Sequence, residues 1–172
     1  MPLATIATTT DTAPAQSLCV RDLTAYLDQI WRDHFADLPR VNDVCIGYCY
    51  PWKSRLGLIR LSVEKTTSFI GINSLLQLQQ VPEYVLITTI AHELTHYAHG
   101  FGSPLPRLWK HPHANKVVDR ELEHRELGEQ LRCCTEWIDK HWYPFYDMQR
   151  ESGWVDILGA HRTAQRNRKM GC

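Results

Sequence analysis

The residues with the clearest chemical potential are His92, Glu93 and His96, which form the pattern His-Glu-x-x-His. On a helix, residues four positions apart lie on the same face, one turn from each other. Two imidazoles placed in this way can bind one Zn²⁺ through their ring nitrogens. The carboxylate of Glu93 can then act as a general base on water held at that ion. The pattern therefore predicts a zinc centre for hydrolysis.

The helix that must position these residues is predicted over residues 83–99. Pro82 suits the first helical position, and Glu83 places a carboxylate near the positive end of the helix dipole. Gly100 is typical of the residue at which a helix ends. Apolar residues recur at helical spacing along the same segment and predict a buried face beside the histidines: Leu86, Ile90, Leu94 and Tyr97.

A catalytic zinc takes three protein ligands and leaves one position open for water, so a third donor is needed. His111 and His113 lie in a loop that Pro112 stiffens. Such a loop can return an imidazole over the open side of the first two. His99 is too far along the helix from His92 to share an ion with it. We expect His99 to be a solvated residue near the helix C-terminus, where positive charge is favoured.

Carboxylates on the next helix offer an alternative third ligand. Glu121 or Glu123 would complete the two-histidine, one-glutamate set of thermolysin-like enzymes, the gluzincin type. The metzincin pattern does not fit, because it requires Gly and His where this chain has His99 and Gly102. Spacing alone leaves the choice between histidine and glutamate open.

Composition limits the classes of protein to consider. A chain of 172 residues with 44% hydrophobic and 22% charged residues is typical of one globular domain. We expect no membrane span, because no apolar run is long enough. The formal net charge of zero gives no global attraction to nucleic acid. The N-terminus does not read as a secretory signal, so we expect a cytoplasmic protein, or one at the nucleoid or in the nucleus if it associates with DNA, with its six cysteines as free thiols. The cysteines contain no Cys-x-x-Cys pair, so no structural zinc ribbon is expected.

Periodicity predicts an α+β domain with a small, mainly antiparallel sheet packed on the N-terminal and histidine-bearing helices. Within the second strand, Ile59, Leu61 and Val63 are expected to point inward. The predicted segments, in order, are a disordered leader at 1–16, a helix at 17–38, strands at 41–50, 56–63 and 68–73, a short helix at 74–80, the histidine-bearing helix, a second long helix from 114 to about 140, an aromatic segment at 141–158 and a basic tail.

Several stretches of this chain resemble the SprT-like metalloprotease family, which contains the SprT and Spartan proteins. The resemblance runs from residue 68 to residue 128. Its matching stretches are Phe69-Ile70-Gly71-Ile72-Asn73, Val81-Pro82-Glu83, Ala91-His92-Glu93-Leu94-Thr95-His96, His113-Ala114-Asn115-Lys116-Val117 and Leu127-Gly128. The Gly-Pro-Glu that often follows the family's third histidine is missing here, and so are the zinc-ribbon cysteines found after the domain in many members.

The basic residues near the C-terminus predict a basic tail at 159–172. The resemblance implies a zincin-like domain over residues 17–158. It implies one catalytic Zn²⁺ held by His92, His96 and His113, a zinc-activated water with Glu93 as general base, and a protein or peptide substrate. DNA-associated proteins are a further substrate class that it suggests, for which the tail is the local support. A function of a different class is the alternative: a zinc-stabilised module that binds protein or DNA and catalyses no reaction.

Overall fold

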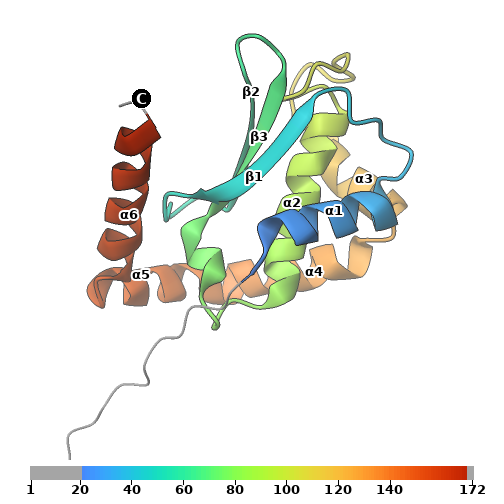
Figure 1. Ribbon diagram of the computed structural model, residues 1–172. Helices are drawn as coiled ribbons and strands as arrows, with labels where there is room; N and C mark the ends of the chain where they lie inside the picture. The colour runs from blue at the N-terminus through green and yellow to red at the C-terminus, as the bar shows by residue number, and fades with distance from the viewer. Residues whose placement is uncertain (1–20, 170–172) are drawn as a thin grey trace, which may run out of the picture.

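The histidine-bearing helix α2 (Glu83–Ala98) lies at the centre of the fold (Figure 1). The computed structural model describes residues 21–169, with side chains as far as residue 161. The leader expected at residues 1–16 lies outside the described residues. Helix α2 begins where the sequence predicts and ends one residue earlier, with Gly100 following in a left-handed conformation.

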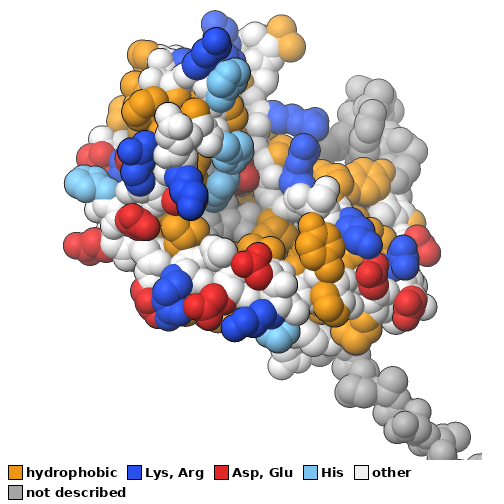
Figure 2. Space-filling view, turned by 180° about the vertical axis from the view of Figure 1, so that it is seen from behind, with side chains coloured by type: hydrophobic (Ala, Val, Ile, Leu, Met, Phe, Trp, Pro, Cys, Tyr) orange, Lys and Arg blue, Asp and Glu red, His pale blue; other side chains and the backbone are white. Residues whose placement is uncertain are grey.

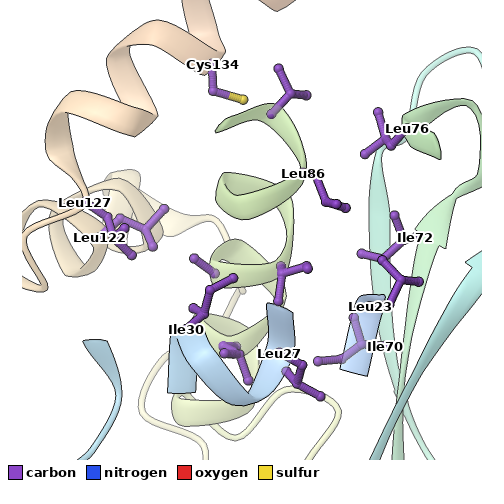
Figure 3. Close-up of a cluster of buried hydrophobic side chains, with 14 of the residues drawn as sticks. Leu23, Leu27, Ile30, Ile70, Ile72, Leu76, Leu86, Leu122, Leu127 and Cys134 are labelled. Carbon is purple, nitrogen blue, oxygen red and sulfur yellow. The ribbon is translucent and has the colours of Figure 1, made fainter. Parts of the chain in front are cut away.

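Helix α2 is enclosed on several sides. The sheet and helix α1 (Leu23–His34) contact it from one direction, while helices α3 (Val117–His124) and α4 (Gly128–Trp137) contact it from another. Figure 3 shows apolar side chains from all of these elements converging on it. The labelled ones are Leu23, Leu27, Ile30, Ile70, Ile72, Leu76, Leu86, Leu122, Leu127 and Cys134. This packing sets the rotation of α2 and therefore the direction of its histidines.

The sheet contains β1 (Asp43–Cys49), β2 (Gly57–Leu61) and β3 (Thr67–Asn73) in the order β1-β3-β2. Strand β2 pairs with β3 antiparallel, with Ile59 opposite Ile70. Strand β1 pairs with β3 parallel, so the prediction of a mainly antiparallel sheet is wrong for one of its two pairings. Strands β2 and β3 form a hairpin, whereas β1 pairs with the other edge of β3 instead of with β2, its neighbour in the sequence. The parallel pairing therefore joins segments that are distant in the sequence.

The expected inward position of Val63 is also wrong, because β2 ends at Leu61 and Val63 lies in the turn to β3 with 93% of its surface exposed. The short helix expected after β3 is present as the 3₁₀ helix η1 (Ser74–Gln77). The fold is therefore mixed α+β, as predicted, with a different strand arrangement.

The long helix expected from residue 114 is broken. A 3₁₀ turn, η2 (Ala114–Lys116), precedes α3, and Glu126 has a positive φ of 63° between α3 and α4. Leu122 and Leu127 are both buried. In a straight helix they would point about 140° apart, because five residues at 3.6 per turn do not return to one face. The break lets both leucines enter the same core.

The chain then continues through the π-helical segment η3 (Ile138–Trp142), α5 (Tyr143–Glu151) and α6 (Trp154–Lys169). Within the segment predicted as aromatic, Trp142 and Phe145 are buried, whereas Tyr143 is exposed. Most of the expected basic tail belongs to α6, and its last residues lie outside the described range. No helix in the described part of the chain is both long and apolar enough to cross a membrane.

Asn73 fixes the segment between β1 and β2. It is fully buried, and its Nδ2 donates to the backbone oxygens of Trp52 and Arg55, both at 2.7 Å. Its Oδ1 accepts from the backbone nitrogen of Leu75 at 3.0 Å, which caps η1. One amide group therefore holds the end of β3, the start of η1 and the segment that leads into β2.

We predict that Asn73→Ala lowers the free energy of unfolding by about 2 kcal/mol, because it removes three hydrogen bonds, of which the one to the buried Leu75 nitrogen cannot be replaced by water. Denaturant unfolding followed by circular dichroism measures the change. The exposed Gln79→Ala is the control and should shift the midpoint little. An equal, small shift for both variants would contradict this role of Asn73.

Candidate metal centre

Helix α2 places its two histidines side by side. The ring centroids of His92 and His96 lie 4.7 Å apart. His96 is buried and His92 is half-buried, and both line one cleft. The one-turn spacing that the sequence predicts therefore produces two imidazoles on one face.

A third imidazole comes from outside α2. His113 ends the loop that precedes η2, and its ring centroid lies 5.3 Å from that of His92 and 4.7 Å from that of His96. One ring nitrogen from each histidine lies within 4.8 Å of the other two. The structure thus brings together the three histidines expected to hold a metal.

The loop from residue 99 to residue 112 folds back onto the end of α2, which carries His113 to the cleft. The backbone nitrogen of Phe101 donates to the oxygen of His96 at 2.8 Å, and that of Leu108 donates to the oxygen of His99 at 3.1 Å. The hydroxyl of the buried Ser103 donates to the oxygen of Tyr97 at 2.6 Å. These bonds satisfy the free carbonyls at the helix end and fix the path of the loop.

Two glycines make this path possible. Gly100 has a φ of 77°, and a Cβ there would lie 2.4 Å from the backbone oxygen of Pro106. Gly102 has a φ of 73°, and its Cβ would lie 2.8 Å from the side chain of Ile59 in β2. Only glycine adopts such conformations without cost while allowing so close an approach.

The donor set fits a metal ion. Burial lowers the pKa of His92 to about 4 and that of His96 to about 3, and the neighbouring imidazoles add to the effect. Both rings are therefore neutral near pH 7, the form that binds metals. The buried Nδ1 of His96 has no hydrogen-bond partner among the described residues. Three ring nitrogens, two from these buried or half-buried histidines and one from the exposed His113, are thus placed where they could hold one metal ion.

Glu93 lies beside these histidines, facing β2. Only 5% of its surface is exposed, and burial raises its pKa to about 8, while the positive charge of Arg55 acts in the opposite direction. A Cβ placed on Gly57 would lie 2.7 Å from Oε1 of Glu93. The carboxylate therefore occupies a narrow, mostly dry space between α2 and the start of β2.

The histidines and Glu93 line one cleft. Strand β2 and the residues before it form one wall, and Leu131, Cys134 and Ile138 from α4 and η3 contribute to another. Burial raises the pKa of Cys134 to about 11, so this wall carries a protonated thiol. Figure 2 shows His, Lys and Arg side chains around a hollow on this face of the molecule.

The other candidate ligands lie elsewhere. His111 is exposed, and Glu123 is exposed on α3 beside Gly128. The carboxylate of Glu121 accepts from Nε of Arg125 at 2.8 Å and lies 4.0 Å from Nε2 of His99. None of these three belongs to the group of histidines that can hold a metal.

The expectation that His99 is solvated is wrong. Its surface is 3% exposed and its ring packs edge-on against Trp109, with the centroids 6.3 Å apart. The reason is the returning loop, which covers the helix end.

Sequence reasoning also missed Arg55 and Gly57. Gly57 lies against Glu93, and the charge of Arg55 acts on it, because the start of β2 passes next to α2. The local pattern of residues carries no signal for that long-range contact.

Comparison with known proteins adds one distant likeness. No protein-family model and no curated protein matches the sequence. Among solved structures, the fold is similar to the crystal structure of the metallopeptidase zymogen of Methanocaldococcus jannaschii jannalysin. The identity is 18% and the TM-score is 0.32, with 66% of this chain and 98% of that chain covered. Because this likeness is so distant, the function has to be argued from the residues of the site.

We predict that the purified protein binds about one Zn²⁺ per chain, and that His92→Ala, His96→Ala and His113→Ala each lose it, because two imidazoles hold the ion far less tightly than three. Elemental analysis after dialysis measures the metal content. His111→Ala and Glu121→Ala are the matched controls and should retain zinc. Loss of zinc in either control, with retention in His113→Ala, would identify a different third ligand.

Proposed function

We propose that this protein is a zinc-dependent metallopeptidase in which His92, His96 and His113 hold one Zn²⁺ and Glu93 is the general base. The observation that supports this most directly is the group of three ring nitrogens within 4.8 Å of one another, next to a buried carboxylate on the same helix turn. An ion held there would supply two things: it would lower the pKa of a water molecule and would polarise a carbonyl oxygen.

Glu93 has the properties that a proton shuttle needs. A general base must lie within reach of the proton that it takes, and Glu93 lines the same cleft as His92, His96 and His113. Its carboxylate can take a proton from water and deliver it to the amine that leaves. The dry space against Gly57 keeps bulk water from competing for that proton.

The shape of the cleft favours a peptide. Strand β2 is an edge strand of the sheet in the described residues, and it forms one wall of the cleft. The free backbone groups of an edge strand can pair with an extended peptide. A peptide bound in this way would place a carbonyl over the three histidines.

We further propose that this metallopeptidase is of the SprT-like type. That family takes its third histidine from a loop before a helix, and His113 ends a loop before η2 and α3. That the substrates are proteins bound to DNA stays a proposal, which rests on the resemblance and on the basic tail.

A zinc-stabilised binding module is the competing function. Structural zinc sites are closed by four protein ligands, whereas the group here has three histidines and faces a cleft. A structural site would also have no use for a carboxylate buried beside it, at a cost in desolvation. Both features favour the peptidase.

We predict that Glu93→Gln retains zinc and folds normally but lowers kcat/KM for a peptide substrate by at least about a hundred-fold, since general-base catalysis is lost. Fluorogenic peptide hydrolysis and metal analysis on the same preparation measure both quantities. Glu123→Gln is the control and should keep its activity. Full peptidase activity in Glu93→Gln would rule out the mechanism.

We also predict that Gly57→Ala keeps its zinc but lowers kcat by roughly ten- to a hundred-fold, because the added methyl group displaces Glu93 and misplacement near 1 Å is costly. Gly47→Ala is the matched control in β1, where the new Cβ would make only ordinary contacts, at 3.5 Å from Phe69. Steady-state kinetics separate the two variants. Equal activity in both would mean that Glu93 tolerates displacement.

A further inference from the structure

A second depression adjoins the metal centre between the β2–β3 hairpin and the returning loop. Its walls include the side chains of Arg60, Lys65 and Arg107, and we call it the basic groove. Apolar side chains, among them Ile59 and Leu105, lie between the charges. The groove is therefore amphipathic, with positive charge at several points along it.

The charge of this groove is not neutralised locally. No acidic residue lines it, and in the described part of the chain no carboxylate forms an ion pair with Arg60, Lys65 or Arg107. All three are exposed, and the guanidinium of Arg107 lies over the ring of Phe101 at 5.2 Å. The loop contributes no carboxylate, because residues 94–118 contain neither Asp nor Glu. Unpaired cations in a concave surface attract an anionic group.

The basic groove is continuous with the catalytic cleft. Ile59, Arg60 and Gly102 line both. Strand β2 runs along both, so a chain extended along β2 over the histidines would continue into the groove. Whatever the groove binds is therefore positioned relative to the bond that Glu93 and the histidines address.

We infer that the basic groove binds acidic side chains of the substrate, so that peptides with Asp or Glu on one side of the cleaved bond are preferred. This inference rests on the proposed peptidase function and names its substrate class. Acidic side chains match the charges, and apolar side chains between them match Ile59 and Leu105. A nucleic-acid backbone fits less well, because it carries a charge on every unit and gains most from stacking on aromatic rings.

Binding is tested first, without turnover. The Glu93→Gln protein with added Zn²⁺ is titrated into a labelled peptide that contains several Glu residues, and into its isosteric counterpart with Gln in their place. We expect the acidic peptide to bind about ten-fold more tightly at low salt, since several exposed ion pairs contribute together, and the difference to shrink at high salt. Equal affinity for both peptides would overturn the inference.

Two double variants with the same change in net charge test whether the preference for the acidic peptide comes from the basic groove. Lys65→Glu with Arg107→Glu should abolish or reverse the preference for the acidic peptide. Lys65→Gln with Arg107→Gln should reduce the preference, and this milder variant is less prone to a folding defect. Arg32→Glu with Lys140→Glu changes the net charge by the same amount at exposed positions outside the groove, and should keep the preference. An equal loss in this control would show a global charge effect and overturn the inference.

Two further measurements separate the remaining outcomes. The first is the affinity for a single-stranded oligothymidylate. If the oligothymidylate binds more tightly than the acidic peptide, and if Lys65→Glu with Arg107→Glu abolishes that binding, the groove binds nucleic acid and the inference is wrong. Hydrolysis of both peptides by the unmodified protein is measured alongside. Preferential binding without hydrolysis would support the groove and overturn the proposed peptidase function.

Discussion

The closure of the 99–112 loop on the C-terminal end of α2 is the constraint on which the site depends. Without it, His92 and His96 are two histidines on a helix, and His113 is seventeen positions beyond the second of them in the sequence. Backbone bonds from Phe101 and Leu108 to the last turn of α2 satisfy carbonyls that every helix end leaves free. The same bonds set the direction in which the loop leaves, and therefore where His113 arrives.

Burial gives the site its chemistry. Removing His92, His96 and Glu93 from water disfavours their charged forms, so these two histidines are neutral and the carboxylate binds its proton more tightly than usual. For a protein without metal, such groups on a central helix are a cost. The apolar residues that enclose α2 on the other sides offset that cost, which is why a buried polar face can sit inside a stable core.

The cleft has two walls, and each depends on a feature that the local sequence does not predict. Strand β2 pairs only with β3, which leaves its other edge beside Glu93 and the histidines. The break between α3 and α4 turns α4 back along α2, so that Leu131 and Cys134 face β2 across the cleft. A straight helix from residue 114 would have removed that wall.

Local sequence determined helix α2, the three strands and the centre of the site, but not the division of the chain into helices after residue 114. Helical spacing and the residues at its ends locate α2 to within one residue, and alternation locates the three strands, because both periods are properties of neighbouring residues. The sequence also identified His92, Glu93 and His96, since their relation is fixed within one turn. Only the tertiary structure decided between His113, His111 and Glu121 as the partner of that pair, set β1 parallel to β3, and brought Arg55 and Gly57 to Glu93. Each of these depends on contacts between segments far apart in the chain, which arise from the packing of a shared core and have no period that a local pattern can display.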